Sequence, residues 1–112
     1  MRLEDRVRLG HMIDACETAV AFAAGRTRPD LDRDRMLLFA LARAAEIVGE
    51  AAARIDPETQ GRFPGIPWSR IVGMRNRLVH AYFDIDRDIL WKTVAEEIPA
   101  LLPALRAASR ED

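Results

Sequence analysis

The stretch L-L-F-A-L-A-R-A-A-E-I-V-G-E-A-A-A-R-I, residues 37–55, decides the fold of this chain. Six apolar residues recur along it at alternating steps of four and three: Leu37, Leu41, Ala44, Val48, Ala51 and Ile55. That spacing predicts a long amphipathic helix that packs lengthwise against partner helices. Asp30 or Asp32 is expected to cap it. Gly49 in its middle lowers helix propensity and would permit another helix to approach closely.

Helical periodicity continues on both sides of this stretch. Residues 3–25 predict a first helix that stops at Gly25. Residues 56–67 contain three prolines and two glycines, which predicts a connector. Pro67 suits the first turn of a third helix. The apolar side of that helix would consist of Ile71, Met74, Leu78 and Ala81.

The C-terminal part predicts a fourth helix, capped by Asp84 or Asp86. Its apolar stripe consists of Leu90, Val94, Ile98, Leu101 and Leu105. Pro99 and Pro103 fall inside this helix, so we expect a kink or a break and a short fifth segment. No stretch has strand alternation, so no strand is expected. The sequence therefore predicts an all-α fold, an antiparallel bundle of four to five helices that forms a single domain over residues 1–112.

Composition and charge restrict the classes of function. The chain has 112 residues, 49% of them apolar and 31% charged, which is typical of a globular domain and argues against disorder. Its net charge of −1 means that any contact with RNA would use a local patch. The single Cys16 can form no internal disulfide and fits a reducing compartment. Without an apolar run of membrane-spanning length or a signal-peptide core, the chain is expected to be cytoplasmic.

The segment M-R-N-R-L-V-H-A-Y-F-D-I-D, residues 74–86, gathers the most reactive side chains. Arg75 offers a planar fork of donors for phosphate, and His80 can transfer protons near neutral pH. Together they supply what transesterification of RNA requires, because a base takes the proton of the ribose 2′-hydroxyl while a cation stabilises the phosphate. RNA provides the nucleophile, so no metal is obligatory.

Helix geometry limits how these side chains can meet. Arg75 and His80, five positions apart, would lie roughly 140° apart around an ideal helix, whereas Arg75 and Tyr82 would lie nearly in line. Either the helix distorts near residues 79–81, or two subunits pool their copies across a symmetric cleft. Asn76 lies four positions before His80, so it would share that face and could orient the imidazole or touch phosphate.

Simpler interpretations stay open for each of these residues. Arg75 could pair with a nearby carboxylate, and His80 could hydrogen-bond at a helix end. Glu46 and Glu50, one helical step apart, are either surface charges or polar contacts for Arg75 or Arg43. The D-x-D-x-D run that begins at residue 84 lacks the glycine and glutamate of a calcium loop, and no histidine has a second ligand at zinc spacing. No metal or cofactor is therefore expected.

Two longer segments closely resemble the HepT family, the small DUF86 proteins of the HEPN superfamily. They are A-L-A-R-A-A-E-I-V-G-E-A-A (40–52) and I-P-W-S-R-I-V-G-M-R-N-R-L-V-H-A-Y-F-D-I-D (66–86). The resemblance implies a homodimer with its R-x4-H motifs facing one cleft, and a metal-independent endoribonuclease that acts as a bacterial toxin. Arg75, His80 and Tyr82 match the family motif. Asn76 matches the polar residue that commonly follows the arginine, and Arg77 from both chains could add charge to the cleft.

The resemblance also implies a partner. In the family an MNT-type nucleotidyltransferase neutralises the toxin by adding adenylyl groups to the tyrosine that corresponds to Tyr82. A bulky anionic group there, two residues from His80, would repel an RNA phosphate. The alternative is a non-catalytic helical companion subunit that binds a minimal nucleotidyltransferase, with Arg75 and His80 lining a nucleotide or protein contact.

Overall fold

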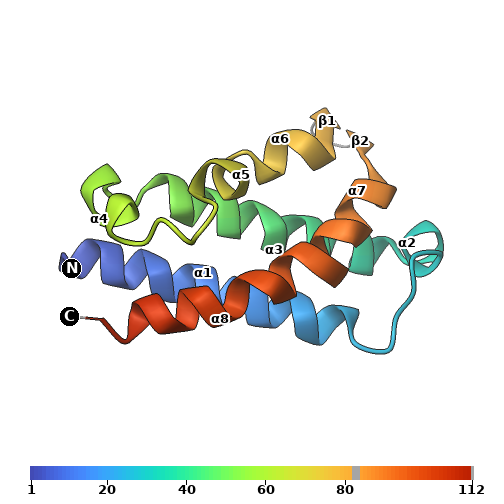
Figure 1. The fold of residues 1–112 in the computed structure, drawn as a ribbon. Coiled ribbons are helices and arrows are strands. Elements are labelled where there is room, and N and C mark those ends of the chain that lie inside the picture. Colours follow the sequence, from blue (N-terminus) through green and yellow to red (C-terminus); the bar gives the residue numbers. More distant parts are fainter. Residues whose placement is uncertain (82–83, 112) are drawn as a thin grey trace.

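The computed structural model describes residues 1–81 and 84–111, and helices dominate it (Figure 1). In chain order the elements are α1 (Leu3–Ala23), α2 (Asp30–Arg33), α3 (Arg35–Ala53), α4 (Pro57–Arg62), α5 (Trp68–Val72), α6 (Met74–Leu78), β1 (Val79–Ala81), β2 (Asp84–Ile85), α7 (Arg87–Lys92), the π-helical turn η1 (Thr93–Glu97) and α8 (Ile98–Ser109). The predicted all-α class is confirmed. None of the helices in these described ranges is both long and apolar enough to cross a membrane.

The long helices α3 and α8 each run antiparallel to α1. Figure 1 shows α3 returning along α1, α5 and α6 running back over α3, and α8 returning along α1, so that both termini lie at one end of the bundle. The guanidinium of Arg6 connects these ends, because it donates to the backbone carbonyl of Glu111 at 3.0 Å. The hairpin of β1 and β2 lies at the opposite end from the termini (Figure 1).

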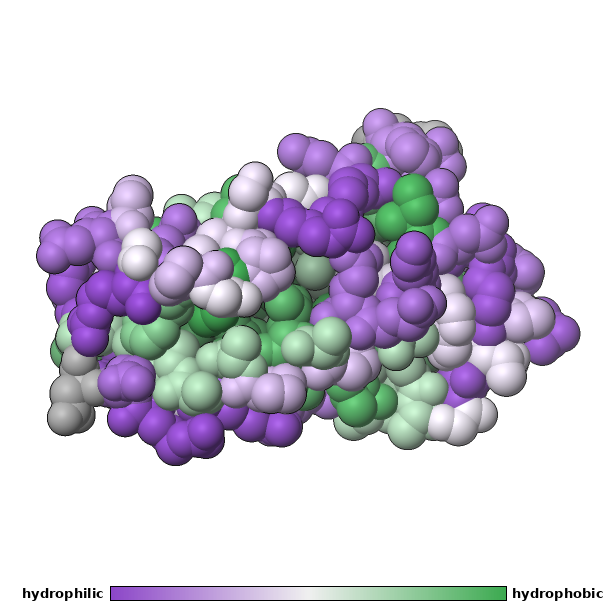
Figure 2. Space-filling model, in the orientation of Figure 1, coloured by the Kyte–Doolittle hydropathy of each residue, from purple (hydrophilic) through white to green (hydrophobic). Residues whose placement is uncertain are grey.

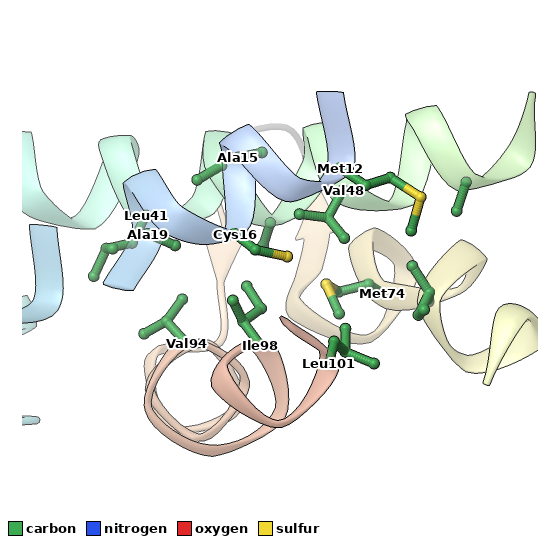
Figure 3. Packing of buried hydrophobic residues seen from close by; sticks show 14 of the residues in the cluster. Met12, Ala15, Cys16, Ala19, Leu41, Val48, Met74, Val94, Ile98 and Leu101 are labelled. Carbon is green, nitrogen blue, oxygen red and sulfur yellow. The ribbon is translucent and has the colours of Figure 1, made fainter. Parts of the chain in front are cut away.

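The core lies where α1, α3, α6, η1 and α8 meet. Figure 3 shows its side chains pointing toward one another, among them Met12, Cys16, Val48, Met74, Val94 and Ile98, each at most 1% exposed. Burying a large apolar side chain contributes about 1.5–3 kcal/mol. Burial also raises the pKa of the Cys16 thiol to about 12, because desolvation disfavours the thiolate. The predicted apolar stripes therefore form one shared core.

Two helix starts differ from the prediction. Asp34 caps α3 by accepting the N–H of Leu37 at 3.0 Å, so the expectation of Asp30 or Asp32 is wrong. Asp30 instead accepts the N–H of Thr27 at 2.7 Å and begins the short helix α2. The predicted connector also contains α4, whose cap is Asp56. An aspartate followed by proline provides both a cap and a preset first turn there.

The hairpin corrects the expectation that no strand forms. The predicted third helix is divided at Gly73 into α5 and α6 and stops at Leu78, so Ala81 lies in β1 and not on its apolar side. Val79 pairs with Ile85 in an antiparallel register that is irregular after this pair. The N–H of Asp86 donates to the carbonyl of Leu78 at 2.8 Å and closes the hairpin. Strands of two and three residues are too short for alternation to be recognised in the sequence.

The C-terminal segment is helical without a gap over residues 87–109, so the expected short fifth segment is wrong, and the irregularity near the prolines is a π-helical turn. Asp86, one of the two predicted caps, accepts the N–H of Ile89 at 3.0 Å and begins α7. A π-helical turn then separates α7 from α8, immediately before Pro99. Because proline has no N–H, the carbonyl four residues earlier loses its helical donor, and the wider turn accommodates this loss. Pro103 lies within α8.

Candidate active site

Gly49 determines how closely the motif-bearing helices approach α3. A Cβ atom at this position would lie 3.0 Å from the carbonyl oxygen of Ile71 and 3.8 Å from the Cβ of Met74. Only a glycine fits there without displacing backbone. The close approach predicted from the sequence is confirmed, and it lets α5 and α6 pack directly on α3 with Ile71, Met74 and Leu78 buried.

Arg75 extends from α6 toward α3. Its Nε lies 3.9 Å from Oε2 of Glu46, an oxygen that Arg43 approaches to 3.3 Å. The Arg75 side chain is 46% exposed and makes no hydrogen bond to any other described residue. A long contact in solvent, with a carboxylate already shared, holds a guanidinium weakly. Arg75 therefore keeps its donors available for a phosphate.

Arg77, two residues later, is engaged by its own chain. Its Nη1 donates to the carbonyl of Arg70 at 3.1 Å, and its Nη2 lies 3.6 Å from Oε1 of Glu97. The same Glu97 oxygen accepts Nε of Arg70 at 2.6 Å. Arg77 therefore connects α6 to α5 and η1, which gives it a structural contact in addition to its predicted place beside RNA.

His80 lies on β1, beyond the end of the helix. Its Nε2 is 3.7 Å from Oδ2 of Asp86, and its side chain is 55% exposed. The N–H of Ile89 is the main cause that lowers the pKa of the Asp86 carboxyl, and the facing imidazole lowers it further against the opposing effect of desolvation. Asp86 is therefore ionised at neutral pH and presents a negative charge to His80.

The end of the helix at Leu78 changes the predicted geometry of the motif. Asn76 lies in α6 and His80 in β1, so the expectation that they share one helix face is wrong. The expected distortion near residues 79–81 is a change from helix to strand. Asn76 is exposed. Tyr82 lies outside the described residues.

Within one chain, the side chains of Arg75 and His80 do not contact each other through a hydrogen bond. In the described part of the molecule Arg75 faces Glu46 and His80 faces Asp86, and no hydrogen bond links the arginine to the histidine. These carboxylate contacts are those of the simpler interpretations given above. The predicted polar contacts of Glu46 are also present, because it faces both Arg75 and Arg43. Glu50 contacts Arg43 but not Arg75. Hydrophilic residues predominate around the hairpin (Figure 2).

Sequence reasoning missed two residues of this region. Asp86 was expected only as a helix cap, and its contact with His80 depends on the hairpin that brings β1 beside β2. Glu97 was not singled out, yet it joins Arg70 to Arg77. A carboxylate two residues before Pro99 was the available signal for Glu97, and the short H-x5-D spacing was the signal for Asp86.

Comparison with known families decides the relationship. The family model described as Ribonuclease HepT-like matches residues 12–108. The chain belongs to this family. The match includes the whole motif-bearing segment, from the close approach at Gly49 to the cap of α7. The resemblance stated from the sequence is therefore confirmed.

Individual relatives support the family assignment. The chain is 38% identical to a "Probable ribonuclease HepT" of Thermococcus cleftensis, over 90% of this chain and 92% of that protein. It is 35% identical to a provisionally named RNase of Caldanaerobacter subterraneus subsp. tengcongensis, over 86% of each chain. A provisionally named RNase of Methanocaldococcus jannaschii is 34% identical, over 80% of this chain and 83% of its own. No solved structure matches significantly.

Proposed function

We propose that this protein is a metal-independent endoribonuclease in which Arg75 and His80 act on one phosphodiester. The observation that carries the proposal is the availability of both groups, an exposed guanidinium and an exposed imidazole, in a chain of the HepT-like ribonuclease family. Each is held by one carboxylate at a long distance, so a phosphate can displace or join that contact. The relatives named as ribonucleases support the same substrate class.

The proposed reaction is an internal transesterification of RNA. His80 takes the proton of a ribose 2′-hydroxyl, and the 2′-oxygen forms a bond to phosphorus. The bond from phosphorus to the 5′-oxygen breaks, and the leaving oxygen takes a proton from a protonated imidazole or from water. Arg75 binds the non-bridging oxygens while negative charge develops on them. The products are a 2′,3′-cyclic phosphate and a 5′-hydroxyl.

The proposed active form is a homodimer with a shared cleft, to which Asn76 and Arg77 contribute supporting contacts. Exposed apolar side chains of α1 and α3 support this, among them Phe22 at 47%, Met36 at 84% and Phe39 at 46%. Burying such side chains against a second copy would remove them from water. This face is connected to the motif, because Arg43 lies on it and shares Glu46 with Arg75.

The finer biological assignment is that of a bacterial toxin which acts in the cytoplasm. Its antitoxin is an MNT-type nucleotidyltransferase that adenylylates Tyr82, two residues after His80 in the sequence. An added nucleotide carries negative charge, which repels an approaching RNA phosphate. Mass spectrometry of the protein, expressed alone and with such an enzyme, tests this. Replacement of Tyr82 by Phe should abolish the added mass, and its persistence in that variant would reject the assignment.

The deciding experiment is an RNA-cleavage assay with chelator present. Arg75→Ala and His80→Ala should each lower the rate on the order of a hundredfold or more. Arg110→Ala, which removes an exposed arginine just after α8 at the end of the bundle opposite the hairpin, is the matched control and should cleave at the wild-type rate. Cleavage by both motif variants at the wild-type rate, or a strict requirement for added metal, would overturn the proposal.

A second function is favoured by one observation. Arg75 and His80 are separately engaged in the single chain, which also fits a companion subunit that docks on a nucleotidyltransferase without cleaving RNA. This alternative predicts a stoichiometric complex and no cleavage by the free dimer. Size-exclusion chromatography of the mixture, combined with the assay above, separates the two functions.

A further inference from the structure

Asp86 is held at the hairpin through both its backbone and its carboxylate. Its N–H donates to the carbonyl of Leu78 at 2.8 Å, and Oδ1 of its carboxylate accepts the N–H of Ile89 at 3.0 Å. Its other carboxylate oxygen, Oδ2, lies 3.7 Å from Nε2 of His80. The first two contacts fix the backbone and one oxygen, so they also fix the direction in which the second oxygen points.

His80 has little else to hold it. Its side chain is 55% exposed, and it lies where the strand register is irregular, between the paired residues Val79 and Ala81. No other described residue hydrogen-bonds to its ring. A ring that is more than half exposed is free to rotate about its side-chain bonds, and that freedom lowers the fraction of time spent in a reactive orientation. Among the described residues, the carboxylate of Asp86 is the polar group that faces the ring and can restrict it.

We propose that Asp86 is a positioning residue for His80, an inference that rests on the proposed function. The carboxylate accepts a hydrogen bond from the Nε2–H of the ring, which leaves the lone pair of Nδ1 directed away to receive the proton of the 2′-hydroxyl. When that proton arrives, both ring nitrogens carry hydrogen, and the negative charge of Asp86 stabilises the imidazolium. Asp86 itself keeps its charge throughout, so no further reactant is needed.

The test must separate this role from capping. Asp86→Asn removes the charge but retains a side chain that caps helices about as well as aspartate. Asp34→Asn is the matched control, because Asp34 caps α3 in the same way, with a lowered pKa, and has no contact with His80. We expect kcat for RNA cleavage to fall roughly tenfold in Asp86→Asn, without an increase in KM, and to stay at the wild-type value in Asp34→Asn. Circular dichroism reports whether both variants are folded.

A double-mutant cycle provides the second measurement. If Asp86 acts through His80, adding Asp86→Asn to His80→Ala should change the residual rate by less than about twofold. A residue needed only for folding would lower the rate by the same factor in both backgrounds, and that result would overturn the inference. Equal kcat values for Asp86→Asn and the wild-type protein would also overturn it while leaving the proposed function intact. Failure of the wild-type protein to cleave RNA would reject the proposed function, and the inference with it.

Discussion

Arg75 and Arg77 lie two residues apart in the same short helix, but their side chains make different contacts. Among the described residues, Arg75 has one ionic contact, at 3.9 Å, with a carboxylate that it shares with Arg43, and its side chain is 46% exposed. Arg77 donates to a backbone carbonyl at 3.1 Å, faces Glu97, and is 29% exposed. Arg77 is therefore built into the structure, whereas Arg75 keeps its hydrogen-bonding capacity for a ligand.

The physical origin of the difference is the position of each residue around α6. Arg75 points toward the outer side of α3, where Glu46 is the nearest carboxylate. Arg77 points toward α5 and the π-helical turn, where Glu97 is 19% exposed and also holds Arg70. Glu46 is buried to a similar extent, at 22% exposure, and it also contacts two arginines, so the firmer hold on Arg77 comes from its hydrogen bond to the carbonyl of Arg70 at 3.1 Å.

The largest expected effect is a difference in RNA cleavage between two alanine variants. Arg75→Ala should lower the rate on the order of a hundredfold or more, because it removes the cation beside the phosphate. Arg77→Ala should retain most of the rate per folded molecule but lose about 1 kcal/mol of stability, since it removes a hydrogen bond to Arg70. Single-turnover kinetics and urea denaturation measure both. Equal rate losses would show that the two arginines share one role.

A second variant disturbs the helix that carries both arginines. Gly49→Ala places a Cβ atom 3.0 Å from the carbonyl oxygen of Ile71, so α5 and α6 must shift. We expect the free energy of unfolding to fall by about 1–3 kcal/mol. Gly10→Ala is the matched control in α1, where a Cβ meets no atom within 4 Å, and it should stabilise the protein by about 0.5–1 kcal/mol. Chemical denaturation of both variants measures the difference, and equal stabilities would contradict the close approach.

The third substitution, in Glu97, would release Arg77 from its ionic contact and leave its guanidinium as available as that of Arg75. Glu97→Gln removes the charge that holds both Arg70 and Arg77, which should cost about 1 kcal/mol of stability because these side chains are partly exposed. The freed guanidinium groups should tighten binding to single-stranded RNA several-fold. They should also steepen the salt dependence of log K by about 0.7 for each added phosphate contact. Titrations at several salt concentrations measure this, and an unchanged slope would place Arg77 out of reach of RNA.

The smallest expected effect concerns the opposite end of the bundle. Burial alone would raise the pKa of Asp5, but hydrogen bonds from Thr59 and the N–H of Asp56, together with the charges of Arg2 and Arg8, lower it. The resulting stability is present above the usual pKa of 3.8 and is lost as pH falls through the lower folded-state value. Asp5→Asn should therefore flatten the acid slope of the unfolding free energy. An unchanged slope in Asp5→Asn would contradict the lowered pKa of Asp5. RNA cleavage per folded molecule should stay at the wild-type rate in this variant.

Local patterns predicted the helices well where apolar periodicity was long. The stripe of residues 37–55 predicted α3, and the steps that follow Asp86 predicted the helix of α7 and α8, in which a π-helical turn precedes Pro99 in place of a break. The predictions failed where a competing local contact existed, as at the start of α3, where Asp34 is the cap and Asp30 belongs to a separate turn. Several aspartates in one loop offer the same capping chemistry, so periodicity alone could not choose among them.

Residue patterns were enough to predict the helical class, the buried stripes, the close approach at Gly49 and the family of the motif. They did not predict that α6 ends at Leu78, that Asp86 faces His80, or that Glu97 engages Arg77 rather than Arg75. Helix periodicity depends on neighbours three and four residues away, whereas these contacts require a hairpin and a π-helical turn that bring separate elements together.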